Sequence, residues 1–228
     1  DMVFVHEINE RRTSADVVFE SLFEEIVALD LLPGAKMSEV EVAKRFGVSR
    51  QPVRDAFSRL GNLGLLVIRP QKATVVRHFS LQGIQNARFI RTAVEVEVLR
   101  RACLNWTGDF DDALDDNLAE QRIAIDANDP ESFHRIDYDF HRLLCESAGA
   151  DFAFETIAAN KAQVDRLCIL SLTGKDGMEA LYGDHTDILA ALRAGDGTKL
   201  DRSIRWHLDR LSPTIEAIHR SHSEYFQD

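Results

Sequence analysis

The spacing of apolar residues changes near residue 80 and divides the chain into two parts. Before this point, apolar residues recur every three to four positions in three stretches, and a β-prone segment follows them up to residue 77. This order predicts three helices and a β-hairpin. From residue 80 onward the helical spacing continues without strand signals, and turn residues separate the expected helices. Their ranges are 80–104, 109–127, 130–148, 150–173, 176–194 and 196–220.

The first predicted helix begins after a short N-terminal segment. Ser14 is its expected N-cap, and Pro33-Gly34 stops it shortly after Leu31. We expect residues 1–13 to form a flexible arm and the helix to pack against the elements that follow.

Residues 38–77 are predicted to form two short helices joined by a tight turn, and then the hairpin. Ser38 and Glu41 form a capping-box pattern for the first helix, which Gly47 ends. Ser49 can cap the second helix, whose exposed face carries long hydrogen-bond donors suited to DNA bases and phosphates. These donors are Arg50, Gln51, Arg54 and Ser58. The layout is that of a winged helix-turn-helix.

Charge is distributed unevenly between the two parts. The whole chain has a formal net charge of −11, which alone argues against nucleic-acid binding. Residues 36–77, however, hold nine basic and three acidic residues, whereas residues 80–228 hold 16 basic and 27 acidic ones. A basic module joined to an acidic one is expected when only the first approaches DNA phosphates.

The run LLPGAKMSEVEVAKRFGVSRQPVRDAFSRLGNLGLLVI resembles the DNA-binding domain of GntR-type bacterial transcription regulators. The shared pattern is a PG turn, an acidic first helix, VSR-x-PVR-x-A, and a GL that leads into the wing. The resemblance implies DNA contacts from the second helix and from the tip of the wing. The implied residues are Ser49, Arg50, Gln51 and Arg54, with Gln71, Lys72 and Ala73 near the minor groove.

This chain departs from the family pattern at two positions. Ala73 stands where the wing commonly has Gly, and Val40 stands where some members have Arg. Because Gly accepts a positive φ that Ala resists, we expect a differently shaped hairpin tip.

Composition and cysteine spacing indicate where the protein is located and whether its cysteines are reduced. The chain is 45% hydrophobic and 29% charged, which is ordinary for a globular protein. It has no run of about 18 uncharged apolar residues, so we expect no membrane partner and a cytoplasmic location. The three cysteines, Cys103, Cys145 and Cys168, are widely spaced and are expected to be buried, reduced thiols.

Three histidines and an aspartate in the second part are candidates for a metal site. Asp137 and His141 are four residues apart, which places them on one helix face, and His185 and His207 lie on later helices. One carboxylate and three neutral imidazoles suit zinc, nickel or manganese. A single histidine is more often a hydrogen-bonded core residue, so the pattern alone leaves metal binding open.

Residues 80–222 resemble the FadR-type effector domain known as FCD, in which many members bind a metal. Its pattern is an Asp-x3-His pair on one helix and two single histidines on later helices. The resemblance implies that Asp137, His141, His185 and His207 are the ligands. His134 and Asp139 are the nearest rivals. His134 lies at a helix start, and Asp139 points about a quarter turn away from His141.

Arg91 and Glu95 resemble the R-x3-E of the first FCD helix. In one interpretation they form a surface ion pair between adjacent helical turns. In the other, Arg91 faces a cavity and binds the carboxylate of an effector. Arg88, about one turn earlier in the helix, takes this role if the helix register is shifted by one turn.

Together, the patterns and resemblances predict a mainly α protein. Its expected parts are the arm 1–13, a winged helix-turn-helix over 14–78, an all-α helical bundle of FCD type over 79–222 that binds the effector and dimerises, and a tail over 223–228.

The resemblance implies a ligand-responsive, sequence-specific transcriptional regulator, a repressor rather than an enzyme. It would act as a homodimer on operator DNA and respond to a small carboxylate metabolite, with a divalent transition metal, zinc first, as cofactor. The alternatives are a metal-responsive sensor, a structural metal, and a metal-dependent hydrolase. The hydrolase is disfavoured because no separate general base or nucleophile is evident.

Overall fold

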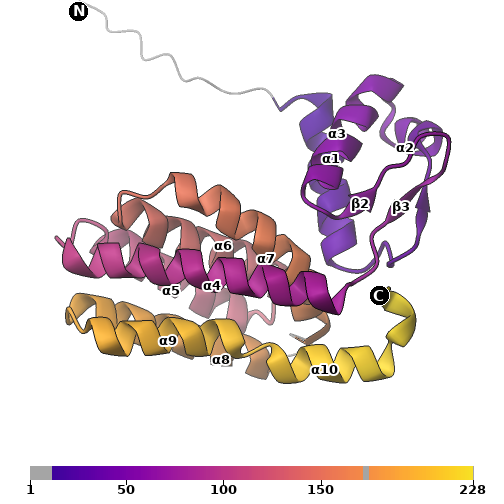
Figure 1. Cartoon of the computed structure of the whole chain (residues 1–228). Coiled ribbons are helices and arrows are strands. Elements are labelled where there is room, and N and C mark those ends of the chain that lie inside the picture. Colours follow the sequence, from indigo (N-terminus) through magenta and orange to yellow (C-terminus); the bar gives the residue numbers. More distant parts are fainter. Residues whose placement is uncertain (1–11, 172–174, 228) are drawn as a thin grey trace, which may run out of the picture. The chain divides into compact units, whose positions relative to one another are not determined.

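The computed structural model describes residues 12–171 and 175–227 and divides into two compact units, residues 1–77 and 78–228 (Figure 1). Residues 1–11, which make up most of the expected arm, lie outside the described residues. Within the described ranges, no helix is long and apolar enough to cross a membrane.

The first unit is a winged helix-turn-helix, and its sheet is larger than the predicted hairpin. Its three strands pair antiparallel in the order β1-β3-β2. The sequence did not predict β1, because two residues are too few to show alternation. The elements are α1 (Ser14–Val27), β1 (Lys36–Met37), α2 (Glu39–Phe46), α3 (Arg50–Asn62), β2 (Leu66–Val67) and β3 (Thr74–Val76).

Both predicted ends of the first helix were wrong. Thr13, not Ser14, is the N-cap of α1, and it forms a complete capping box with Asp16. The helix ends at Val27 rather than near Leu31, because Leu29 adopts a left-handed conformation with φ of 64°. The turn therefore begins before the Pro33-Gly34 signal.

The predicted caps of α2 are confirmed. The Ser38 side chain accepts a hydrogen bond from the Glu41 N–H, and Gly47 ends the helix at φ of 65°. α3 begins after Ser49, whose hydroxyl makes no capping hydrogen bond. Helices α1 and α3 pack together over a core that includes Leu22, Ile26, Val53, Phe57 and Leu60.

The second unit is an all-α bundle in which α4 packs against α7 and α9, α5 packs against α6, and α8 packs against α9 (Figure 1). Its apolar core includes Leu99, Leu114, Phe140, Ile188 and Leu192. The helices are α4 (Leu81–Leu104), α5 (Asp111–Asp126), α6 (Pro130–Ser147), α7 (Phe152–Ser171), α8 (Lys175–Arg193), α9 (Gly197–Asp209) and α10 (Ser212–Ser221), followed by the 3-10 helix η1 (Ser223–Tyr225).

The prediction of one helix over 196–220 was wrong, since α9 and α10 are separate. Pro213 lies in the first turn of α10. Its ring has no N–H and would clash with the carbonyl four residues earlier in a continuous helix, so the chain breaks at Arg210 and Leu211.

The C-terminal residues form ordered structure after α10. Phe226 makes a parallel bridge with Phe79, in which the Phe79 N–H donates to the Tyr225 carbonyl and the Gln227 N–H donates to the Phe79 carbonyl, both at 2.8 Å. The rings of Phe79 and Phe226 lie 5.2 Å apart, and the Arg166 guanidinium lies over the Phe79 ring. Both ends of the second unit are therefore tied together.

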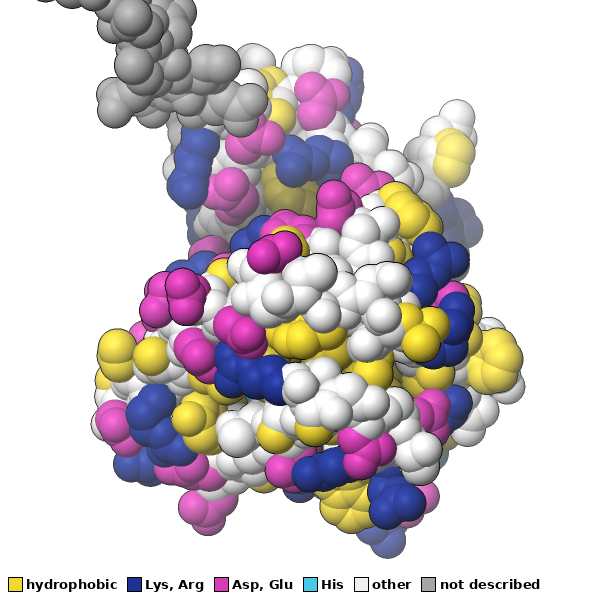
Figure 2. Space-filling view, turned by 90° about the vertical axis from the view of Figure 1, so that its left-hand side faces the viewer, with side chains coloured by type: hydrophobic (Ala, Val, Ile, Leu, Met, Phe, Trp, Pro, Cys, Tyr) yellow, Lys and Arg dark blue, Asp and Glu magenta, His cyan; other side chains and the backbone are white. Residues whose placement is uncertain are grey.

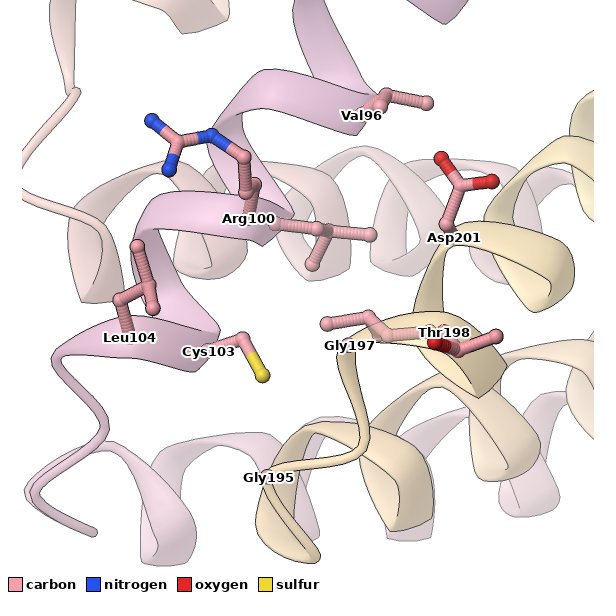
Figure 3. Close-up of a pocket in the computed structure, with 10 residues that line it drawn as sticks. Val96, Arg100, Cys103, Leu104, Gly195, Gly197, Thr198 and Asp201 are labelled. Atoms are coloured by element: carbon pink, nitrogen blue, oxygen red, sulfur yellow. The ribbon is translucent and has the colours of Figure 1, made fainter.

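Two of the three cysteines have described side chains, and both are free thiols. Cys145 is buried and Cys103 is half-buried, while the side chain of Cys168 lies outside what the structure describes. Cys103 lines a pocket of about 580 Å³ between α4 and the start of α9, together with Val96, Arg100 and Asp201 (Figure 3). None of the predicted metal ligands lines that pocket.

Candidate metal centre and DNA-binding surface

The structure brings the four predicted metal ligands together in the interior of the bundle. Helix α6 carries Asp137 and His141, α8 carries His185, and α9 carries His207. One ligand atom from each lies within 4.8 Å of every other, and all four residues are buried. The cluster is therefore compact enough to surround a single ion.

Neither rival residue belongs to this cluster. The His134 ring packs edge-on against Tyr138, and Asp139 accepts a hydrogen bond from Arg142. Asp139 is two residues from both Asp137 and His141 and therefore faces another side of α6, whereas His134 shares their face about one turn nearer the start of the helix.

Asp137 occupies the centre of the cluster. Its Oδ1 lies 3.2 Å from Nε2 of His185 and 3.6 Å from Nε2 of His141. Its Oδ2 lies 2.6 Å from Nζ of Lys161, a buried residue of α7. One carboxylate oxygen therefore faces the imidazoles, while the other is held by an ammonium.

Each imidazole also has a polar neighbour at Nδ1. For His141 the neighbour is Oε2 of Glu95 at 2.7 Å, for His185 it is Oε1 of Gln121 at 2.9 Å, and for His207 it is Oδ2 of Asp184 at 3.4 Å. At His185 the acceptor Gln121 fixes the tautomer that leaves Nε2 without a proton, as partners of metal-bound histidines do, whereas Nδ1 of His141 and Nδ1 of His207 make no hydrogen bond of good geometry.

Further hydrogen bonds fix these neighbours in turn. Gln121 donates through its amide nitrogen to Asn117, and Asn117 donates to the Ile136 carbonyl. Because the Gln121 nitrogen is used in this way, its oxygen must accept from Nδ1–H of His185. Glu95 accepts from Arg91, and Asp184 accepts from Arg210.

Burial and charge together set the protonation states. Burial lowers the pKa of His207 to about 3 and also lowers the pKa of His185, so both rings are neutral at neutral pH. Burial alone would raise the pKa of Asp137, but Lys161 and the adjacent imidazoles hold it well below its usual range. Neutral imidazoles and an ionised carboxylate are the forms that bind metals.

The pKa of His141 is shifted in the opposite direction from those of the other two histidines. Burial would lower it, but the carboxylates of Glu95 and Asp137 outweigh burial and raise the pKa. Burial would raise the pKa of Glu95, yet Arg91 and His141 keep this carboxyl ionised.

The residues present fit a divalent transition metal. Nε2 of His185 is fully buried and has no hydrogen-bond partner of good geometry, although it faces a carboxylate oxygen. A buried nitrogen without a hydrogen-bond partner lowers the stability of the folded protein unless a ligand such as a metal ion binds it. Three imidazoles and one carboxylate form a donor set that suits zinc, nickel or manganese.

A pocket of about 230 Å³ opens beside the cluster, and Arg91, Asp137, Lys161, His207 and Arg210 line it. Arg91 lies there on α4, with Nη2 3.1 Å from Nε2 of His141. Arg88 instead bonds Asp209 and Ser212. Of the two arginines considered from the sequence, Arg91 therefore faces the cluster.

The sequence patterns did not predict the roles of four polar residues that surround the ligands. They are Glu95 as a partner of His141, Gln121, Lys161 and Asp184. A signal for Gln121 was present, since it lies on the apolar face of α5 between Leu118 and Ile125. Lys161 gave no such signal, because a lysine on an amphipathic helix is normally solvent-exposed.

The residues predicted to contact DNA are exposed. Ser49, Arg50, Gln51 and Arg54 lie at the start of α3, and Lys72 lies in the turn between β2 and β3. Glu39 of α2 accepts hydrogen bonds from both Arg50 and Arg54, at 2.8 and 3.0 Å. A single carboxylate therefore holds two of the predicted donors.

The wing tip has an unusual conformation at Gln71 rather than at Ala73. Gln71 has a φ of 58°, a left-handed value that glycine adopts more readily. In the described residues Ala73 has no such angle. On the face of the molecule in Figure 2, acidic and basic side chains are interspersed.

A winged helix-turn-helix followed by a separate all-α domain is the layout of a DNA-binding regulator. Residues 14–76 match the bacterial regulatory proteins of the gntR family, and residues 87–210 match the FCD domain. The chain belongs to the GntR family and carries an FCD domain. It is a DNA-binding transcriptional regulator.

Individual relatives agree with this assignment. The chain is 38% identical over 211 residues to the HTH-type transcriptional repressor RspR of Escherichia coli K12, and the match covers 92% of each chain. The structure of E. coli McbR/YncC superposes with a TM-score of 0.76 at 18% identity, covering 91% of this chain and 99% of that one. A putative GntR regulator from Rhodococcus superposes with a TM-score of 0.71 at 21% identity, covering 89% and 98%. At such identities the structures show the fold alone.

Proposed function

We propose that this protein is a cytoplasmic repressor that binds operator DNA as a homodimer and is released by a small carboxylate bound beside a metal. The observation that carries the proposal is the buried cluster in which each of the four ligands lies beside its own polar neighbour. Family membership and the printed name of RspR as a repressor support the regulatory role.

In this proposal Asp137, His141, His185 and His207 hold the ion, with zinc the first candidate and nickel or manganese the others. A bound ion would supply positive charge, and an ion that takes five or six ligands would keep open positions for a carboxylate oxygen beside the four protein ligands. Arg91 is planar and always charged, and it would bind the same carboxylate through its guanidinium.

At the DNA, Ser49, Arg50, Gln51 and Arg54 would contact bases and phosphates in the major groove, and Lys72 would contact the minor groove. Glu39 would orient Arg50 and Arg54 before binding. A homodimer would present two such surfaces to an operator with twofold symmetry.

Elemental analysis of protein purified without a chelating tag tests the metal site. We expect about one transition-metal ion per chain in the parent and little in the variant His185→Ala, His207→Ala. His134→Ala is the matched control, because His134 is close in sequence but lies outside the cluster, and it should keep the parent's metal content. A double variant that keeps its metal, or a parent that takes up none of zinc, nickel and manganese, would refute the proposed site.

A further inference from the structure

Glu39 is an acidic residue that contacts two of the side chains predicted to bind DNA. It is the first residue of α2, and its Oε2 accepts hydrogen bonds from Nη2 of Arg50 at 2.8 Å and from Nε of Arg54 at 3.0 Å. Arg50 and Arg54 are about one turn apart on α3. One carboxylate oxygen therefore links the start of α2 to the first turns of α3.

This contact is too exposed to contribute much to folding. The Glu39 side chain is 30% exposed, and those of Arg50 and Arg54 are 55% and 50% exposed. Water and salt screen ion pairs of this kind, and their contribution to the stability of a fold is small. The arrangement is therefore better explained by its effect on the two guanidinium groups than by its effect on stability.

The contact restricts the orientation of both arginines. An arginine recognises a guanine through two parallel hydrogen bonds to one base edge, so the plane of its guanidinium has to lie in one orientation. Arg54 donates to Glu39 through Nε, which leaves its two terminal nitrogens for a base. Because both groups are oriented before DNA arrives, less conformational entropy is lost on binding.

The charge of Glu39 has the opposite effect on the DNA backbone. Hydrogen bonding from Arg50 lowers the pKa of the Glu39 carboxyl, so this group is ionised at neutral pH. A carboxylate beside two guanidinium groups cancels part of the positive charge that attracts phosphates. Since phosphates are the same in every sequence, this loss of attraction applies equally to all DNA.

We propose that Glu39 determines sequence specificity in two ways: it orients Arg50 and Arg54 for base edges, and its charge weakens the binding of this surface to DNA of any sequence. The inference rests on the proposed DNA-binding surface. It goes beyond the orientation of the two arginines, because it makes the affinity for unrelated DNA depend on the same carboxylate. Specificity is the difference between the binding free energies for the operator and for unrelated DNA.

Glu41 provides a matched control in the same turn of α2. It is acidic and exposed, and within the described part of the chain it pairs with neither Arg50 nor Arg54. Glu41→Gln therefore removes the same charge from the same turn and leaves the contact between Glu39 and the arginines intact.

Two duplexes of equal length and base composition measure the two effects: one selected by the protein from a random pool, and a scrambled version of it. Fluorescence anisotropy on the full chain at low salt gives the affinity for each duplex. We expect Glu39→Gln to bind the scrambled duplex at least about twofold more tightly than the parent does, and to lower the ratio of selected to scrambled affinity at least about fivefold. Glu41→Gln should keep the parent's ratio within about twofold.

Three results would overturn the proposal. They are a smaller fall of the ratio in Glu39→Gln, a scrambled duplex that this variant does not bind more tightly, and a Glu41→Gln ratio outside the twofold range.

Glu39→Asp separates the effect of charge from the effect of reach. Aspartate keeps the negative charge, but its side chain is one methylene group shorter and draws the carboxylate back from the two guanidinium groups. We expect weaker binding of the selected duplex, with the affinity for the scrambled duplex within about twofold of the parent's. A larger gain on the scrambled duplex would overturn the assigned effect of charge.

Arg54→Ala, measured on the same two duplexes, distinguishes failure of this inference from failure of the proposed surface. If Arg54→Ala loses discrimination while Glu39→Gln keeps it, only the role of Glu39 is overturned. If Arg54→Ala discriminates between the duplexes as the parent does, the proposed DNA-binding surface is overturned, and this inference with it.

Discussion

At the scale of single residues, the buried polar neighbours of the candidate metal ligands help to set how those ligands are oriented. His185 shows this most clearly. The Gln121 amide nitrogen donates a hydrogen bond to Asn117, so the Gln121 oxygen faces His185 and can only accept. Nδ1 of His185 must therefore be the donor. Nε2 is then bare and directed at Asp137. The protein has therefore oriented this ring before any ion binds.

Replacing Gln121 should weaken metal binding although Gln121 is not a ligand. We expect Gln121→Leu to lower zinc affinity by about 10- to 100-fold, because the His185 ring loses its fixed tautomer and orientation. Competition with a chromogenic chelator measures this change. Gln82→Leu, at an exposed glutamine of α4, should leave zinc affinity unchanged, and equal affinities in both variants would contradict the assigned role.

The ligands themselves could be placed from sequence, but their partners could not. The four-residue spacing of Asp137 and His141, with the family resemblance, selected the residues that now lie together. Lys161 and Asp184 belong to other helices, and their approach depends on how α7, α8 and α9 pack. Periodicity within one helix contains no information about that packing.

At the scale of elements, local signals fixed some boundaries and tertiary structure fixed others. Ser38 and Gly47 bound α2 as predicted, since capping side chains and a left-handed glycine act within a few residues. The separation of α9 from α10 was also encoded locally, by Pro213, but the apolar periodicity across it favoured one helix. Strand β1 has two residues, and only its pairing with β3 reveals it.

Two glycines with open surroundings should respond oppositely to alanine. Gly47 has φ of 65° and nothing within 4 Å of an added Cβ, so Gly47→Ala should cost about 1 kcal/mol of stability through backbone strain alone. Gly183, in α8, is equally open without a positive φ, so Gly183→Ala should stabilise by about 0.5 to 1 kcal/mol. Urea denaturation followed by circular dichroism measures both, and a neutral Gly47→Ala would contradict the strain.

The C-terminal segment should hold the start of the second unit in place. Phe226 contacts both Phe79 and His219, so Phe226→Ala should increase hydrogen exchange at the amides of Phe79 and Gln227. Hydrogen–deuterium exchange with mass spectrometry detects the change in those peptides. Trp206→Ala, at an exposed aromatic residue, is the control. Unchanged protection at Phe79 in Phe226→Ala would show that the bridge does not stabilise this end.

At the scale of the whole molecule, charge is distributed according to the parts expected to bind DNA and metal. The basic segment 36–77 lies in the unit with the helix-turn-helix, and the acidic unit contains the metal candidate. The proposed release by an effector requires that the effector bind more tightly to the state with lower DNA affinity, and a tenfold effect corresponds to about 1.4 kcal/mol of coupling.

DNA recognition should depend on the first turns of α3 and not on its last turn. Arg54→Ala should weaken specific DNA binding by about 10- to 100-fold, because Arg54 points outward beside Arg50. Arg59→Ala is matched within the same helix, since Arg59 pairs with Asp16 and lies over the Phe19 ring of α1, and it should bind DNA like the parent. Fluorescence anisotropy on a duplex selected by the protein from a random pool gives both affinities, and equal losses would count against the assigned surface.

The most direct test of a metal-dependent effector switch measures DNA affinity while a small carboxylate is added. The samples are the zinc-loaded parent and the variant His185→Ala, His207→Ala, on the same selected duplex, titrated with a set of small carboxylates that includes lactate and malate. We expect at least one acid to weaken DNA binding by the parent about tenfold or more and to leave the variant unaffected. A parent that ignores the whole set, or a variant that responds as the parent does, would contradict the switch.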